Sequence, residues 1–181
     1  MATTTRPVTA DDLQALGEDA HVELIRGAIH EMSPSKPLHG FVSGNFAMEL
    51  GLYGRQAGGR ILTGEAGYLL ERDPDTLLVP DVAYVKTDRL PPRDQWNRYC
   101  EVAPDVVVEV LSPSNSPAEM DRKVAIYLAA GVPLVWVADP VPQRITAHRP
   151  GMAPQLLEID DVLDGGDVLP GFRVPVRTFF G

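Results

Sequence analysis

The chain has 181 residues and 44% of them are hydrophobic, which is enough to bury one sizeable core, and we expect a single domain over residues 1–181. The formal net charge of −9 argues against a protein that coats nucleic acid through charge alone. The longest uncharged run outside the N-terminus falls short of the ~20 residues of a membrane-spanning helix, and no signal-peptide pattern opens the chain. We therefore expect a cytoplasmic protein with no membrane partner.

Short elements open the chain and a long helix follows them. Thr9 can cap a short helix that ends near Gly17, and residues 21–33 then alternate like two strands. Between Pro37 and Gly58 the apolar residues recur every three to four positions, which predicts a helix with one buried face, although four glycines lie within it.

The middle of the chain has the pattern of strands interrupted by one basic segment. Strands are predicted in residues 60–71 and 80–86. Residues 86–98 carry four Lys or Arg side chains against two aspartates, with Trp96 among them, and we interpret this segment as a solvated loop. Five of the six residues 106–111 are branched aliphatics, a composition typical of a strand buried on both faces.

The second half begins with the clearest helix signal. Ser116 has the position of an N-cap and Glu119 completes a capping box, while Gly131 marks the far end of the helix. Residues 133–139 and 144–149 read as two further strands. A strand, a helix and a strand in succession predict a right-handed crossover within one mixed sheet, so we expect an α/β (α+β) fold in which helices flank a mixed β-sheet.

One carboxylate interrupts the aliphatic strand at Glu109. Burying an unpaired charge costs several kcal/mol, so Glu109 needs a cation, a metal, or water reached through a cleft. Asp81 opens the nearest upstream strand, and neighbouring strands place facing side chains ~5 Å apart, which suits one divalent ion. Two carboxylates there form the hard-oxygen site that Mg²⁺ uses, with water and substrate phosphate completing it. Asp105 lies ~13 Å from Glu109 along an extended strand, so we assign it to the start of that strand.

Two further polar residues can reach such a site. Lys123 borders the apolar face of the capped helix, and most lysines so placed extend to solvent. Because this helix must lie against the sheet that holds Glu109, its ammonium can instead enter the carboxylate site, orient or help deprotonate a water, and stabilise developing negative charge. His39 can hydrogen-bond a phosphate or a metal-bound water, but a polar residue at the start of a helix is the simpler interpretation.

Four stretches of the sequence carry a family resemblance: PDVAYV, PDVVVEVLSPSNS, RKVAIYLAAGVPLVWVAD and LPGFRVPVRTFF. Together they resemble the bacterial putative restriction endonuclease domain family, a branch of the PD-(D/E)XK nuclease superfamily. Residues 23–40 resemble the N-terminal segment of that family, so the resemblance covers nearly the whole chain. It implies a restriction-endonuclease-like core with the order α-β-β-β-α-β that hydrolyses phosphodiester bonds in DNA with Mg²⁺, or with Mn²⁺.

The resemblance also implies roles for individual residues. Asp81 matches the first acid of the motif and Glu109 the second, which makes both of them metal ligands. Leu111 occupies the usual lysine position of the superfamily, and Lys123 matches the place to which this family moves the lysine. Glu23 matches an N-terminal acidic position near the same metal, and an exposed strand carboxylate is an equal alternative for it.

Two function classes follow from these residues. The first is a Mg²⁺-dependent endonuclease with Asp81, Glu109 and Lys123 as its catalytic residues. The second is a catalytically inactive binding or regulatory module that keeps the nuclease fold, and the acidic composition and the displaced lysine are compatible with it. Cutting both strands of a duplex requires two sites, so we expect a homodimer. The C-terminal residues 171–180 supply either its contact surface or a last strand that closes the core.

Overall fold

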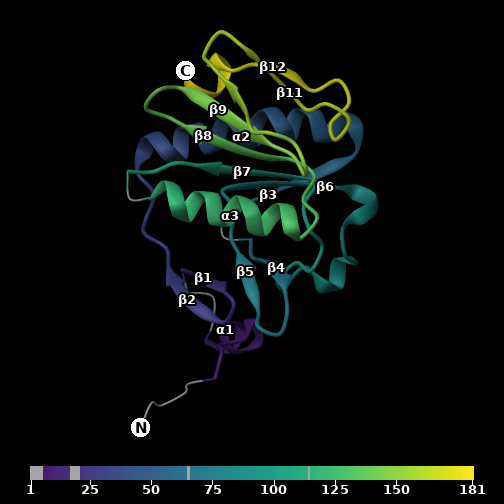
Figure 1. Ribbon diagram of the computed structural model, residues 1–181. Helices are drawn as coiled ribbons and strands as arrows, with labels where there is room; N and C mark the ends of the chain where they lie inside the picture. Colours follow the sequence, from purple (N-terminus) through teal and green to yellow (C-terminus); the bar gives the residue numbers. More distant parts are fainter. Residues whose placement is uncertain (1–5, 17–20, 65, 114) are drawn as a thin grey trace.

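The computed structural model of the protein describes residues 6–16, 21–64, 66–113 and 115–181, and the predicted end of the first helix at Gly17 falls outside them. Figure 1 shows a larger body that contains both long helices and a smaller group of strands beside the N-terminus. Among the described residues, none of the helices combines the length and the apolar character that crossing a membrane requires.

The smaller group is a four-stranded antiparallel sheet with the strand order β2-β1-β5-β4. Its elements are α1 (Ala10–Leu16), β1 (Val22–Ile25), β2 (Ala28–Glu31), β4 (Tyr68–Glu71) and β5 (Thr76–Leu78). The two predicted strands within residues 21–33 are therefore confirmed. Buried apolar side chains from Ala10, Leu13, Leu24 and Leu77 form a small core beneath α1.

The larger body is built on a six-stranded sheet with the order β10-β9-β8-β7-β6-β3. Its strands are β3 (Gly59–Thr63), β6 (Val82–Lys86), β7 (Val106–Val110), β8 (Val135–Asp139), β9 (Arg144–His148) and β10 (Gln155–Leu157). Only the β7 and β8 pair is parallel, and the helix α3 (Pro117–Ala129) connects them. The predicted mixed sheet and its crossover are confirmed.

Alternate residues of β7 face the two long helices. Val106, Val108 and Val110 pack in one cluster with side chains of α2 (Pro37–Ala57), and Val107 packs in another cluster with side chains of α3. Because successive side chains of a strand point to opposite faces, Glu109 leaves the sheet on the α3 side. Figure 1 shows α3 crossing in front of the sheet and α2 behind it, so helices flank both faces.

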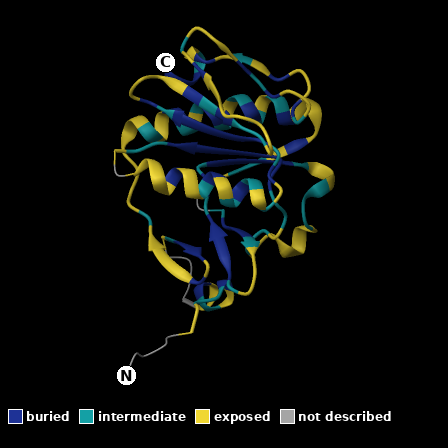
Figure 2. Ribbon diagram, viewed as in Figure 1, coloured by how far each residue is buried: buried dark blue, intermediate teal, exposed yellow. Residues whose placement is uncertain are grey.

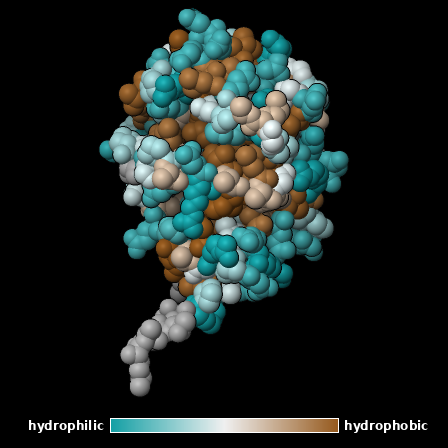
Figure 3. Space-filling model, viewed as in Figure 1, coloured by the Kyte–Doolittle hydropathy of each residue, from teal (hydrophilic) through white to brown (hydrophobic). Residues whose placement is uncertain are grey.

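The four-stranded sheet is joined to the α3 face by apolar contacts. Ile25 and Leu78 belong to the same buried cluster as Met120 and Val124 of α3. In the space-filling view of this side, hydrophobic residues gather across the middle of the molecule and hydrophilic residues surround them (Figure 3). Glu23 lies two residues before Ile25 on β1, so the contact that joins the two sheets also brings this carboxylate toward α3.

Several elements depart from the sequence-based expectations. Residues 60–71 are divided between two sheets as β3 and β4, and the short strands β5, β10 and β11 (Val162–Asp164) were not predicted. The basic segment contains two 3₁₀ turns, η1 (Thr87–Arg89) and η2 (Arg93–Gln95). Strands of three residues carry too few side chains for a period of two to be recognised in the sequence.

The C-terminal segment belongs to the core. It forms β12 (Arg173–Pro175), which pairs with β11, and the short helix α4 (Arg177–Phe180). Its large apolar side chains at Phe172, Val176, Phe179 and Phe180 are buried against α2 and β8, as Figure 2 shows for this end of the chain. The prediction that this segment supplies a contact surface for a second copy is therefore wrong, and the alternative of a closing strand is confirmed.

The crossover helix α3 begins with the predicted capping box. The backbone N–H of Glu119 donates to Oγ of Ser116 at 3.2 Å, and the backbone N–H of Ser116 donates to Oε2 of Glu119 at 2.9 Å. Two N–H groups that the helix itself cannot pair are thereby satisfied, which fixes where the first turn begins.

Loss of this cap should be measurable as a stability change. We expect Ser116→Ala to lower the free energy of unfolding by about 1 kcal/mol, or about 2–4 °C in Tm at this chain length, because one N–H loses its acceptor. Chemical denaturation monitored by circular dichroism measures this. Ser33→Ala, in an exposed loop, is the matched control and should change stability by less than about 0.5 kcal/mol. Equal effects of the two substitutions would contradict the capping role.

Candidate active site

A cleft of about 460 Å³ lies where the four-stranded sheet, α3 and the start of α2 meet. Its lining contains ten titratable side chains, and the five that converge at its centre come from five separate parts of the chain. Glu23 is on β1, Asp81 directly precedes β6, Glu109 is on β7, Lys123 is on α3 and His39 is in the first turn of α2. The fold thus brings together residues that lie as much as 100 positions apart in the sequence.

Glu109 has a cation as its nearest partner. Its side chain is buried, and the Lys123 ammonium Nζ lies 2.8 Å from its Oε1. The hydroxyl of Tyr127, one helical turn after Lys123, donates to the same Oε1 at 2.6 Å. A hydrogen-bonded ion pair of this kind explains how an aliphatic strand tolerates a carboxylate.

Glu23 holds the same ammonium from the opposite sheet. Its Oε1 lies 3.0 Å from Nζ of Lys123 and accepts a hydrogen bond from the backbone N–H of Val79 at 2.9 Å. Only 7% of Glu23 is exposed, so the alternative of an exposed strand carboxylate is wrong. Lys123 itself does not extend to solvent, because its side chain is 16% exposed and its nitrogen bridges two carboxylates.

Asp81 lies beside Glu109 through the sheet register. Val82 pairs with Val108 across the antiparallel β6 and β7, so the next pair outward is Asp81 with Glu109, on the same face of the sheet. Oδ2 of Asp81 accepts a hydrogen bond from the backbone N–H of Val110 at 2.7 Å. Nε2 of His39 lies 3.2 Å from the same oxygen, so His39 contributes to the cleft and does more than begin a helix.

The pKa values of the cleft reflect an excess of carboxylates over cations. Burial raises the pKa of Glu109 to about 7, with Asp81 and Glu23 adding to the effect and Lys123 opposing it. Burial disfavours the charge of Lys123, but Glu109 and Glu23 together outweigh it and raise the pKa of the ammonium. The hydrogen bond to Asp81 raises the pKa of His39. Each of these shifts has the direction that uncompensated negative charge produces.

The donor set of the cleft fits one divalent cation. Three carboxylates and one ammonium leave two formal negative charges there, and within the described residues the structure assigns no hydrogen bond to Oδ1 of Asp81 or to Oε2 of Glu109. Carboxylate oxygens of this kind suit Mg²⁺. The described part of the chain contains no group of three or more His, Cys, Asp or Glu side chains placed to hold a metal alone, so water and substrate oxygens would complete the coordination.

Other candidates from the sequence lie outside the cleft. Asp105 accepts hydrogen bonds from the backbone N–H of Lys86 at 2.8 Å and from Arg89 at 2.7 Å, so it anchors the basic segment, as a strand-start residue should. Tyr127 lies on the apolar face of the capped helix, and its hydroxyl contact with Glu109 was not among the sequence-based expectations. The four-residue spacing from Lys123 to Tyr127 on one helix face is the signal that predicts the shared target.

Removal of the ammonium should destabilise the protein in a pH-dependent way. In Lys123→Met the carboxylates of Glu109 and Glu23 stay buried without their cation, and we expect a loss of about 3 kcal/mol at pH 8.5. The loss should be smaller at pH 6. Without Lys123 the pKa of Glu109 rises above about 7, so folding favours its protonated form, and stability is lost as pH rises through that folded pKa.

Denaturant melts of both proteins at the two pH values measure this. Arg55→Met, at an exposed cation of α2 outside the cleft, is the matched control and should show neither the loss nor its pH dependence. A loss of equal size at both pH values would contradict the assignment of Lys123 as the counter-charge of Glu109.

Comparison with known proteins agrees with the fold and the resemblance of the sequence. The chain aligns at TM-score 0.83 with the crystal structure of "a putative nuclease belonging to DUF820" from Anabaena variabilis, at 21% sequence identity over 96% of this chain and 98% of that one. At this identity the match shows a shared fold. No curated protein sequence matches the chain significantly. The Uma2 family, described as "Putative restriction endonuclease", matches residues 10–177, and the chain therefore belongs to this family.

Proposed function

We propose that the protein is a Mg²⁺-dependent endonuclease that hydrolyses phosphodiester bonds in DNA. The observation that carries the proposal is the Lys123 ammonium, held 2.8 Å from Glu109 in an open cleft that Asp81 also lines. An ammonium beside metal-binding carboxylate oxygens can stabilise the charge that develops in phosphoryl transfer and place a metal-activated water at the phosphate.

Asp81 and Glu109 are the residues that would hold the metal, through Oδ1 and Oε2. When bound, a divalent ion supplies charge neutralisation at the phosphate and a lower pKa for an attacking water. Tyr127 and the backbone N–H of Val110 fix the orientation of the two carboxylates through their second oxygens. The carboxylates are thus held in place before substrate arrives, which is what a metal site requires of its supporting hydrogen bonds.

Lys123 is the group that would orient the attacking water and stabilise the negative charge that builds on the phosphate oxygens. Glu23 acts through it, because Oε1 of Glu23 accepts from Nζ and keeps the ammonium beside Glu109. If Glu23 also bound the metal, as the family resemblance implies, it would do so through Oε2, the oxygen that does not contact Lys123. His39, whose raised pKa favours the charged imidazolium, would donate a hydrogen bond to a phosphate oxygen at the mouth of the cleft.

Cleavage of DNA is the direct test. Purified protein should nick or linearise plasmid DNA in Mg²⁺ or Mn²⁺, and Asp81→Asn or Glu109→Gln should abolish the activity because each removes a ligand charge. Lys123→Met should lower turnover by about 100-fold, as when one transition-state donor is lost. Gel analysis of plasmid forms measures all three.

The control variant is Asp167→Asn, an exposed acid outside the cleft, which should cut like the wild type. Activity that survives both Asp81→Asn and Glu109→Gln would belong to a contaminant or to another site. A folded wild type that binds the metal but cuts no DNA would instead favour the inactive binding or regulatory module, for which the net charge of −9 is the favouring observation.

Metal binding has a readout that is independent of cleavage. With a Kd of about 1 mM, Mg²⁺ at about 10 mM adds ~1.4 kcal/mol to the stability of the wild type, or about 3–6 °C in Tm, and adds almost nothing to Glu109→Gln. The affinity should fall about tenfold between pH 8 and pH 6, because Glu109 has a pKa of about 7 and must lose its proton to bind. Melting curves in EDTA and in Mg²⁺ at constant ionic strength measure both. Equal shifts in the two proteins would exclude Glu109 as a ligand.

A further inference from the structure

A second cavity, of about 600 Å³, adjoins the cleft on the other side of β1. Successive residues of this strand face the two spaces, because Val22 lines the cavity and Glu23 lines the cleft. The side chains of Met32 and Val79 line both. A molecule that occupies the cleft therefore has the mouth of a second site immediately beside it.

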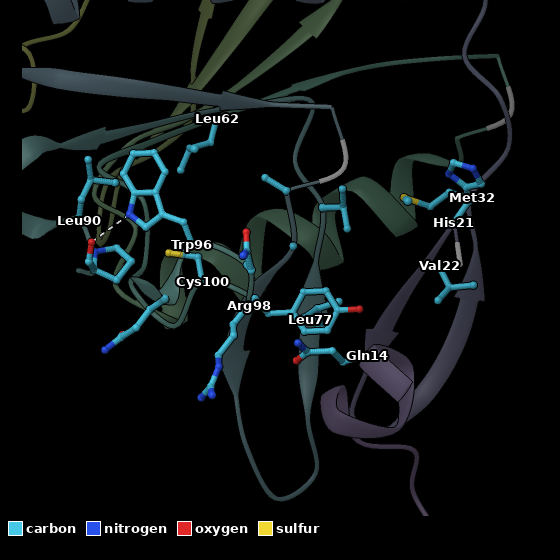
Figure 4. A pocket seen from close by; sticks show the side chains of 17 residues that line it. Gln14, His21, Val22, Met32, Leu62, Leu77, Leu90, Trp96, Arg98 and Cys100 are labelled. Carbon is cyan, nitrogen blue, oxygen red and sulfur yellow. Dashed lines mark hydrogen bonds between the residues drawn. The ribbon is translucent and has the colours of Figure 1, made fainter. Parts of the chain in front are cut away.

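The cavity joins the four-stranded sheet to the basic segment 86–98. Figure 4 shows Trp96, Leu62 and Leu90 on one side, His21, Val22 and Met32 on the other, and Leu77 between them. Its volume lies within the range of sites for small ligands, and an apolar lining with a few polar groups is the usual composition of such sites. The basic segment is thus more than the solvated loop expected from its charges.

Two aromatic rings of the lining are held in fixed positions. Nε1 of Trp96 donates to the carbonyl oxygen of Pro91 at 3.0 Å, the hydrogen bond drawn in Figure 4, and the guanidinium of Arg93 lies 4.6 Å from the centre of the indole ring. Arg93 is not part of the lining, so it covers the ring from outside the cavity. The ring of Tyr99 packs so closely over Gly67 that a Cβ there would lie 2.7 Å from it.

The polar groups of the cavity are amides and one guanidinium. The side chains of Gln14, Gln95, Asn97 and Arg98 are exposed and line it, and within the described residues the structure assigns them no hydrogen bond or ion pair. Amide groups pair with the edges of nucleobases, and a guanidinium pairs with phosphate. Rigid aromatic faces add the stacking surface that every base recognises.

We propose that this cavity receives an unstacked nucleobase of the DNA strand whose phosphate lies in the cleft. The inference rests on the proposed function for the identity of the strand. Its independent support is the combination of two aromatic rings held in position, three exposed amide side chains and the guanidinium of Arg98 in one cavity lining. Lys86 and Arg89 of the basic segment face Asp105. The cations that the segment offers near the cavity are therefore Arg98 in the lining and Arg93 over the indole ring. These two guanidinium groups attract phosphate locally in an otherwise acidic protein.

The two tryptophans of the chain make the site directly observable. Trp136 is fully buried in the core, whereas Trp96 is 37% exposed at the cavity, so a ligand that stacks in the cavity quenches the emission of Trp96. The probe is a short single-stranded DNA oligonucleotide, titrated in EDTA and in Ca²⁺ buffer. We expect the oligonucleotide to quench the emission of Trp96. An oligonucleotide of equal length without bases should bind about tenfold more weakly, because it keeps the phosphates but loses base stacking.

Variants locate the effect. Measured by anisotropy of a labelled oligonucleotide, Trp96→Ala should weaken binding about tenfold, and Trp96→Phe, which keeps an aromatic ring, should restore it to within about twofold. Val141→Ala, an exposed apolar residue on a distant turn, is the matched control and should bind like the wild type. Equal binding of the strands with and without bases, or an unchanged Kd in Trp96→Ala, would overturn the proposal.

The outcome also separates this inference from the proposed function. Wild type that cuts DNA in Mg²⁺ without Trp96 quenching would leave the nuclease assignment standing and exclude the base site. Quenching with full base dependence in a protein that cuts nothing would support the base site and exclude the nuclease. Tighter binding of the matched duplex than of the single strand would also exclude the base site, because a paired base cannot enter the cavity.

Discussion

The bridge that Lys123 makes between Glu109 and Glu23 is the interaction on which the cleft depends. The ammonium is the reason that a valine-rich strand can contain a carboxylate, and its charge is still too small for the three acids that surround it. A buried cluster in which carboxylates outnumber cations contributes little to the stability of the fold. The remaining negative charge of the cleft is the feature on which the proposed metal site rests.

The same bridge connects the two sheets. Glu109 and Lys123 come from the crossover of the six-stranded sheet, whereas Glu23 comes from the four-stranded sheet. The ammonium thus adds a polar link to the apolar contacts that Ile25, Leu78 and Tyr68 make between the two parts. The contact brings the N-terminal segment to the cleft although this segment lies outside the crossover. It also makes β1 the strand that separates the cleft from the second cavity.

The sequence predicted the parts of this arrangement that depend on local pattern. The capping box at Ser116 and the aliphatic strand each carry a signal within a few residues, and together they define the crossover and place Glu109 and Lys123 on facing elements. The partnership of Glu23 with Lys123 depends on how two sheets pack, and no local pattern encodes that. The contact of Lys123 with Glu109 lies within the crossover, so the sequence could place the ammonium at the carboxylate site, and the structure shows it 2.8 Å from Glu109.

Leu111 shows how one chemical group can be supplied from two places in a chain. It follows Glu109 by two residues, so its side chain leaves the strand on the α3 side, and it packs against the apolar cluster that contains Met120 and Val124. The helix that covers this face delivers the ammonium of Lys123 to the same neighbourhood. A lysine at position 111 would leave the sheet on the same side as Glu109, so the strand and the helix are two positions from which an ammonium could serve this carboxylate.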